Sequence, residues 1–247
     1  TNTLEVYYDF GTDGGSNVTD QSGNGHTGTN NGATFDSDGK VPGGCYDFDG
    51  SDDRITIADC EELDLTNVWT LMAWIRPDDV SDYSMIIDKI EASGKENYRI
   101  LKRYDELEYG WNNTSSSFNN GYTTSDVFST GIWYHVAWTH AGSSTNDETL
   151  YIDGVEQSVH YEYTSGGTPR TNSQDVAVGC DARLSGCFFD GKIDEVRIYK
   201  RVLTSNEVVE CWRAGLSDHP GEVSFNDGVS YTAPLGDVSM GIYTNSN

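Results

Sequence analysis

The stretch Phe189-Asp-Gly-Lys-Ile-Asp-Glu-Val-Arg-Ile-Tyr199 carries the clearest structural signal in this sequence. Its side chains alternate along the chain, which places Asp194, Val196 and Ile198 on one face and their neighbours on the other. A period of two is typical of a β-strand with one buried face. The stretch therefore predicts a strand of a layered β structure.

Further elements surround this strand. Thr204 and Glu207 have the spacing of a capping box, which predicts one short helix after the strand. Upstream, Trp69–Pro77 is richly apolar and is predicted to lie in the middle of a sheet. The segments 45–59 and 151–156 are predicted to be hairpins, the second with an Asp-Gly turn. Many short strands with a single helix indicate an all-β fold.

The composition fits one extracellular domain. The chain has 247 residues, a length at which all-β sandwiches routinely form a single unit, and 36% of its residues are hydrophobic. No stretch approaches the roughly 18 to 20 consecutive apolar residues of a membrane span, and no charged and apolar leader opens the sequence. We expect a secreted protein whose signal peptide has been removed.

The charge limits the classes of partner. Forty acidic and fifteen basic residues give a formal net charge of −25, which repels a phosphate backbone, so nucleic acid is not an expected partner. The acidity has two interpretations. It is either a solvated surface suited to high salt, or, for a few carboxylates at strand ends, a source of oxygen ligands for Ca²⁺.

The five cysteines favour disulfides over metal or redox chemistry, because no C-x-x-C pair occurs. Cys180 and Cys187 flank a short polar stretch and form one expected pair. Cys45 and Cys60 flank the first predicted hairpin and form the second. Cys211 is then left unpaired, or joins two molecules.

The order of six motifs is more specific than any one of them. They are Asp20-Gln-Ser-Gly-Asn-Gly-His26, Phe48-Asp-Gly-Ser-Asp-Asp-Arg-Ile55, Thr70-Leu-Met-Ala-Trp-Ile-Arg-Pro77, Gly131-Ile-Trp-Tyr-His-Val-Ala-Trp138, Leu150-Tyr-Ile-Asp-Gly-Val155 and Phe189–Tyr199. Over residues 1–215 this series resembles the laminin G-like jelly-roll family of concanavalin A-like proteins. The resemblance implies an antiparallel, two-sheet jelly-roll sandwich with one short helix near the C-terminus. Residues 216–247 lie beyond it, as an extension that packs on the sandwich, links to a neighbour or pairs with one.

The same resemblance implies a calcium ion that ties the first polar loop to the last core strand. The matching positions are Asp20, Asn24, the backbone near His26, and Asp194. Ca²⁺ takes six to eight oxygen ligands and would fix a loop that has no apolar anchor. The competing interpretation is that Asp and Asn in this Gly-rich loop make ordinary turns.

A glycan site needs aromatic faces for sugar CH groups and polar side chains for hydroxyls. A short span supplies both kinds of group. The candidate ligand-binding residues are Tyr98, Arg99, Arg103, Trp111, Asn112 and Tyr122. The competing interpretation is that Leu107, Tyr109 and Trp111 alternate because they belong to the core.

Catalysis has little support in the sequence. Glycosidases of this sandwich type carry a pattern like Glu-x-Asp-x-x-Glu on one strand, and here Glu62-Leu-Asp-Leu-Thr-Asn67 begins the pattern but ends in Asn. Glu106 and Glu108 share a strand face at a spacing of about 7 Å, which is within the range of glycosidase carboxylates. Exposed acidic faces are commoner in so acidic a protein, and we predict that the protein is not an enzyme.

The leading functional hypothesis is a calcium-stabilised, extracellular module that binds polysaccharide or glycoprotein glycans or acts in adhesion. The main alternative is a structural subunit of a surface layer, filament or appendage, joined to its neighbours through the C-terminal segment or Cys211. A polysaccharide hydrolase or lyase is the third hypothesis.

Overall fold

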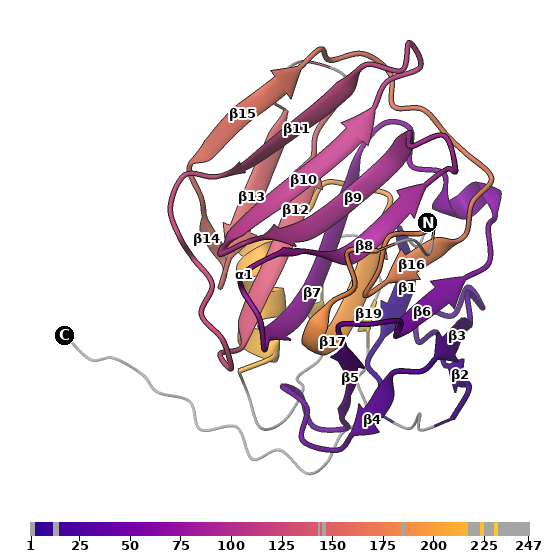
Figure 1. The fold of residues 1–247 in the computed structure, drawn as a ribbon, viewed down its shortest axis with the longest axis vertical. Helices are drawn as coiled ribbons and strands as arrows, with labels where there is room; N and C mark the ends of the chain where they lie inside the picture. The colour runs from indigo at the N-terminus through magenta and orange to yellow at the C-terminus, as the bar shows by residue number, and fades with distance from the viewer. Residues whose placement is uncertain are drawn as a thin grey trace.

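The computed structural model describes residues 3–11, 15–142, 144, 147–183, 186–216, 223–224 and 230–231. Two antiparallel β-sheets lie face to face and form a sandwich. Figure 1 looks onto the outer face of one sheet, with the second sheet behind it and the helix behind that. The predicted all-β jelly-roll sandwich with one helix near the C-terminus is confirmed.

Sheet A contains eight strands in the order β14-β13-β12-β7-β17-β5-β4, with β1 also paired to β17. Their bounds are β1 Leu4–Tyr8, β4 Thr34–Asp36, β5 Cys45–Asp49, β7 Trp69–Pro77, β12 Tyr134–His140, β13 Glu148–Ile152, β14 Val155–Glu156 and β17 Asp190–Tyr199. The apolar strand β7 lies between β12 and β17, as its sequence predicts. The β13–β14 hairpin has its predicted Asp-Gly turn, and both residues of this turn have positive φ, which suits a tight hairpin turn.

Sheet B contains nine strands in the order β15-β11-β10-β9-β8-β16-β6-β3-β2. Their bounds are β2 Asn17–Val18, β3 Gly28–Asn31, β6 Arg54–Ile57, β8 Tyr83–Ile90, β9 Glu96–Arg103, β10 Glu106–Asn112, β11 Phe118–Thr123, β15 Val159–Thr164 and β16 Val176–Val178. A short 3-10 helix, η1 (Glu61–Leu63), leads from sheet B into β7. Strands β8 to β11 are consecutive neighbours, so polar side chains on their outer faces are brought together.

The outer faces of the two sheets differ in character. On sheet A the helix α1 (Ser205–Ala214) packs over a second apolar cluster that includes Met72, Tyr151, Tyr199 and Val208. Thr204 caps this helix in the predicted capping box with Glu207. No helix among the described residues covers the outer face of β8 to β11, which faces the viewer in Figure 1.

The prediction of a hairpin over residues 45–59 is wrong. Strands β5 and β6 follow one another in the chain, but β5 belongs to sheet A and β6 to sheet B. The turn at Gly50 therefore carries the chain from one sheet to the other. The alternating apolar residues of both strands still point inward, because the core lies between the sheets.

The alternation of β17 is also interrupted. A bulge between Asp194 and Arg197, with Glu195 at a φ of 54°, shifts the phase of the strand. Ile193, Val196 and Ile198 consequently face the core. The predicted grouping of Asp194 with the last two of these residues does not hold, because the bulge adds one residue between them.

All five cysteines are free thiols, so neither expected disulfide is formed in the structure. Cys45 lies beside the carbonyl of Asp38, while the Cys60 sulfur is 3.6 Å from Nδ1 of His26. Cys211 is buried in α1, with 2% of its surface exposed. Its thiol is therefore not presented to a neighbouring molecule, contrary to the predicted role in self-association.

The predicted extension, residues 216–247, lies almost entirely outside the described residues. Within it, β18 (Val223–Ser224) pairs with β19 (Ser230–Tyr231). Among the described residues, no helix has the length and apolar character needed to cross a bilayer.

Candidate functional site

The outer surface of strands β8 to β11 and β15 is the polar face of the molecule. It comprises Asp88, Glu96, Arg99, Arg103, Glu106, Glu108, Asn112, Phe118, Asn120, Tyr122, Glu162 and Tyr163. The pairing register explains why these side chains meet. Arg99 stands opposite both Asp88 and Gly110, and Gly110 stands opposite Asn120, so one row crosses four strands.

Arg99 is the centre of the polar face. Its Nη1 atom is 2.6 Å from Oε1 of Glu96, and its Nη2 atom is 2.6 Å from Oε1 of Glu108. Arg103 extends this network, pairing with Glu106 and lying 3.4 Å from the second oxygen of Glu108. Both arginines are held with fixed guanidinium planes, which suits specific recognition of polar ligand groups.

Burial raises the pKa of two carboxyl groups on the polar face. Burial raises the pKa of Glu96 to about 7, although the Arg99 guanidinium opposes the rise. Burial also raises the pKa of Asp88 well above its ordinary value, and the charge of Glu96 adds to this effect. Glu96 therefore changes protonation near neutral pH.

Four buried polar atoms of this face lack a hydrogen-bond partner within the described part of the chain. They are Oδ1 of Asp88, Oε2 of Glu96, Nε of Arg99 and Oδ1 of Asn120. Buried polar atoms without partners are few in natural proteins, because each costs free energy. Together they form a row of polar atoms on adjoining strands, just beneath the surface of the polar face.

A glycine keeps this row open. A Cβ atom at Gly110 would lie 2.7 Å from Nε of Arg99 and 3.0 Å from Oε2 of Glu96. The absence of a side chain at this position lets both charged groups lie close over the β10 backbone. The glycine thus makes room over the β10 backbone for two of the unpartnered atoms.

Aromatic rings border the charged row. The ring of Phe118 lies 4.9 Å from the Arg99 guanidinium, and the Arg103 guanidinium lies 3.9 Å from the ring of Tyr122. Tyr163 on β15 is 6.2 Å from Phe118 between ring centroids and is 56% exposed. The face therefore combines accessible ring surface with donors and acceptors.

The six predicted ligand-binding residues divide into two groups. Arg99, Arg103, Asn112 and Tyr122 share the polar face. Tyr98 and Trp111 lie in the core between the sheets, with no more than 1% of their surfaces exposed. Trp111 therefore belongs to the core, as the competing interpretation of its alternation with Leu107 and Tyr109 predicted.

Trp111 has a structural partner that explains its burial. Its indole Nε1 donates to Glu148, which also accepts from Nε1 of Trp138 and lies 2.9 Å from Nδ1 of His140. Trp69 stacks on the His140 ring at 3.7 Å between centroids. These side chains form a polar centre inside the core, so the Trp111 ring is not available to a ligand.

The predicted calcium ligands already take part in hydrogen bonds within the protein. Asp20 accepts hydrogen bonds from the backbone N–H groups of Tyr7, Ser22 and His26, while the Asn24 amide donates to the β1 backbone. This loop lies along the edge of β1 that faces away from β17. Asp194 lies on β17, where its carboxylate accepts from the backbone of Val41 and Glu195.

An ion at Asp20 would have to displace these N–H donors, so a calcium site and the hydrogen-bonded loop are alternatives. We expect the same melting temperature in excess Ca²⁺ and in chelator at fixed ionic strength, because the loop already satisfies the carboxylate. Thermal unfolding followed by circular dichroism measures this. A rise specific to Ca²⁺ over Mg²⁺, and lost in Asp20→Asn, would contradict it.

A group of acidic residues that sequence reasoning did not select lies at the β5–β6 connection. Ligand atoms of Asp49, Asp52 and Asp53 lie within 4.8 Å of one another. Asp49 accepts from the N–H of Ser51, and Asp53 accepts from the N–H of Asp49. Turn formation explains these carboxylates.

Comparison with known proteins assigns this sandwich to a superfamily. The sequence model of the concanavalin A-like lectin/glucanases superfamily matches residues 49–209, more than half of the chain. The chain belongs to this superfamily. No curated protein sequence matches the chain.

Solved structures similar to this concanavalin A-like domain come from clostridial toxins and from an arabinanase. The binding domain of Paraclostridial Mosquitocidal Protein 1 has a TM-score of 0.66 at 16% identity, over 85% of this chain and 52% of that one. The receptor binding domain of botulinum neurotoxin type G has a TM-score of 0.60 at 15% identity, over 85% and 51%. The chain thus spans about half the length of these toxin domains.

Domain 4 of AbnA, an extracellular GH43 arabinanase from Geobacillus stearothermophilus, was solved in complex with arabinotriose. It has a TM-score of 0.63 at 24% identity, over 84% of this chain and 97% of that domain. Identities this low show a shared fold and no more. The function of this concanavalin A-like domain must be argued from its own polar face.

Sequence reasoning missed several residues of the polar face of this concanavalin A-like domain. Asp88, Glu96, Asn120 and Tyr163 were not among the candidates. A signal was present for Arg99, which lies between the core residues Tyr98 and Ile100. Glu96 has the same parity as those core residues, so alternation alone would have placed it inward, and a register shift opposite Glu96 changes this. The pairing of five strands was needed to show which outward side chains meet.

Proposed function

We propose that this protein is a noncatalytic carbohydrate-binding module that works outside the cell and binds its glycan on the polar face. The observation that carries the proposal is the row of four buried polar atoms without partners at Asp88, Glu96, Arg99 and Asn120. Sugar hydroxyls both donate and accept, so they suit a row that combines the Arg99 donor, the Asn120 acceptor and two carboxyl groups whose protonation can adapt.

The aromatic border supports the same ligand class. Sugar rings present CH faces that pack on aromatic side chains, while their hydroxyls require polar partners. Tyr163 and Phe118 offer ring surface beside the charged row, and the side chain of Arg99 retains 17% exposure. A chain of sugar units lying across β9 to β15 would contact both kinds of group.

The arginine pairs support a binding role over catalysis. A glycosidase needs one carboxyl group as acid and a second as base or nucleophile. Here Glu106 is paired with Arg103, and Glu108 is paired with both Arg99 and Arg103. Carboxylates held in this way orient the guanidinium groups, which suits a binding face.

The similar structures also support the extracellular part of the proposal. They include toxin binding domains and a domain of an extracellular arabinanase that was crystallised with a trisaccharide. The net charge of −25 disfavours strongly anionic polysaccharides as ligands. We therefore propose neutral polysaccharides or glycoprotein glycans as partners.

Replacing Tyr163 with alanine tests the proposal. We expect wild-type protein to bind at least one member of a panel of arabino-, xylo-, cello-, laminari- and galacto-oligosaccharides, measured by isothermal titration calorimetry. Tyr163→Ala should weaken this binding about tenfold, because it removes exposed ring surface. It should not change the melting temperature.

Ile132→Ala is the matched control, since Ile132 is 53% exposed and lies outside the polar face. It should bind like wild type. If wild type and Tyr163→Ala bound the oligosaccharide with equal affinity, the glycan would not bind on the polar face. New reducing ends or unsaturated products from the same panel would show catalysis and overturn the noncatalytic assignment.

A further inference from the structure

A recess separate from the polar face lies at one end of the sandwich. It encloses about 520 Å³ between the loop that follows η1 and the segment around Thr171. The residues that line it are Glu61, Asp64, Leu65, Thr66, Asn67, Val68, Thr171 and Lys200. Its volume lies within the range of small-molecule sites.

Buried polar side chains of β9 hold both walls of this recess. The side chain of Asn97 is fully buried and accepts from the N–H of Leu65 at 3.2 Å. Its amide donates to the carbonyl of Leu65 at 2.8 Å and to the carbonyl of Arg170 at 2.6 Å. One side chain thus ties the loop at Leu65 to the chain segment that leads to Thr171.

Two more buried groups fix the same loop. The Lys89 ammonium, which is fully buried, lies 3.1 Å from Asp64 and also pairs with Asp59. The hydroxyl of Tyr98 donates to the carbonyl of Leu63 at 3.2 Å. Tyr98 therefore serves this loop, although it was predicted to contact a ligand directly. The recess is pre-formed, which lowers the entropic cost of binding.

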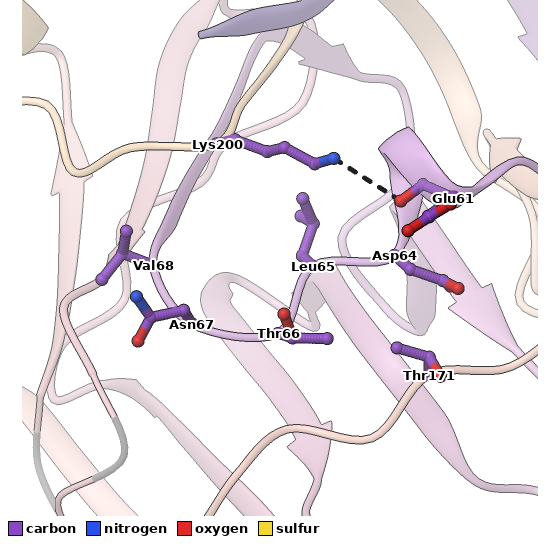
Figure 2. Close-up of a pocket in the computed structure, with 8 residues that line it drawn as sticks. All are labelled: Glu61, Asp64, Leu65, Thr66, Asn67, Val68, Thr171 and Lys200. Atoms are coloured by element: carbon purple, nitrogen blue, oxygen red, sulfur yellow. Dashed lines mark hydrogen bonds between the residues drawn. The ribbon is translucent and has the colours of Figure 1, made fainter.

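Lys200 supplies the positive charge of the recess. Figure 2 shows its side chain reaching across the recess toward Glu61, whose carbonyl oxygen is 3.5 Å from Nζ. Among the described residues, Lys200 takes part in no ion pair within 4.0 Å, whereas Asp64 shares the Lys89 ammonium with Asp59. Most of the hydrogen-bonding capacity of this ammonium group is therefore free for a ligand.

The remaining groups define the ligand class. Thr66 and Thr171 offer hydroxyls, and Asn67 offers an amide, all three on exposed residues. No aromatic ring lines the recess, so it cannot stack along a sugar chain. Glu5 and Glu62 also lie near Lys200, and their charges oppose an anion.

We propose that this recess is a second carbohydrate site, which takes one unit at the end of a neutral glycan through Lys200, Asn67 and the two threonines. It does not depend on the polar face, because the two sites share no residue. End-on capture follows from a partly open recess that is lined by polar groups and has no ring among its lining residues for stacking along a sugar chain.

The test is a titration of ¹⁵N-labelled protein by NMR with arabinose, xylose, glucose, galactose and galacturonic acid. Amide signals of residues 64–68 and 171 should shift with at least one neutral sugar. Lys200→Met should weaken that binding about tenfold through loss of charged donors. Lys95→Met, a matched change in the β8–β9 turn, should leave it unchanged, as should Tyr163→Ala.

Three results would overturn the second site. They are shifts confined to polar-face amides, shifts at residues 64–68 that persist in Lys200→Met, and tighter binding of galacturonic acid than of every neutral sugar. A neutral disaccharide that binds no better than its terminal monosaccharide supports end-on capture, whereas a gain of tenfold or more overturns it. If the recess amides still shift with a neutral sugar in Tyr163→Ala, the second site binds sugar whether or not the polar face does.

Discussion

Replacing Arg99 with methionine is expected to lower the free energy of unfolding by about 3 kcal/mol, because it removes one partner of a buried charge network. Glu96 and Glu108 are 3% and 2% exposed, and both pair with this guanidinium. Methionine keeps much of the side-chain volume but leaves two carboxylates facing each other without the bridging charge. Denaturant unfolding measures the loss.

A second substitution should recover part of that loss. In Arg99→Met the added change Glu96→Gln removes one of the uncompensated charges, so the double variant should be about 1 kcal/mol more stable than the single variant. Arg76→Met is the control, since Arg76 pairs with Asp78 at the surface and such pairs contribute little. Equal losses at Arg76 and Arg99 would show that Arg99 does not organise the polar face.

The contribution of Glu96 to stability should rise as the pH falls from 8 to 5, while the buried His135, whose pKa burial lowers to about 3, acts in the opposite direction. Burial raises the pKa of Glu96 from an ordinary 4.5 to about 7. A group whose folded-state pKa is raised contributes stability that is present below its unfolded pKa and lost as the pH rises through its folded pKa. This contribution changes by about 2 kcal/mol between pH 5 and pH 8.

Glu96→Gln isolates the contribution, because glutamine resembles the protonated acid and does not titrate. Its melting temperature relative to that of wild type should fall by roughly 5 °C as the pH falls from 8 to 5, because His135 titrates equally in both proteins. Glu156→Gln on exposed β14 removes one negative charge without burial and should keep the wild-type slope. Parallel pH profiles for wild type and Glu96→Gln would contradict the burial of a titrating carboxyl group at this position.

Local patterns predicted much of the fold because they depend on neighbouring residues. The apolar run of β7, the Asp-Gly turn of β13–β14 and the capping box of α1 each depend on a few consecutive side chains. The connection at Gly50 could not be read in this way. A turn between two strands has the same local signal whether the strands pair or enter different sheets.

The candidate site was only partly predictable for a related reason. Arg99 and Arg103 were selected with the core residue Tyr98, because residue type alone does not say which face of a strand a side chain occupies. The bulge at Glu195 likewise separated Asp194 from the face that a strict period of two had given it. Asp88, Arg99 and Asn120 form one row because strands β8, β9, β10 and β11 pair side by side. This pairing joins residues that lie far apart in the sequence.

The most direct test of the proposed binding surface is the side-chain NMR signal of Arg99 during titration with an oligosaccharide that binds the protein. The Nε–Hε signal can be assigned by its absence in Arg99→Met. Since this N–H has no partner in the structure, glycan binding on the polar face should shift it in a saturable way, with the affinity measured by calorimetry. An unchanged Arg99 signal at saturation, with shifts confined to other parts of the molecule, would contradict glycan binding at the polar face.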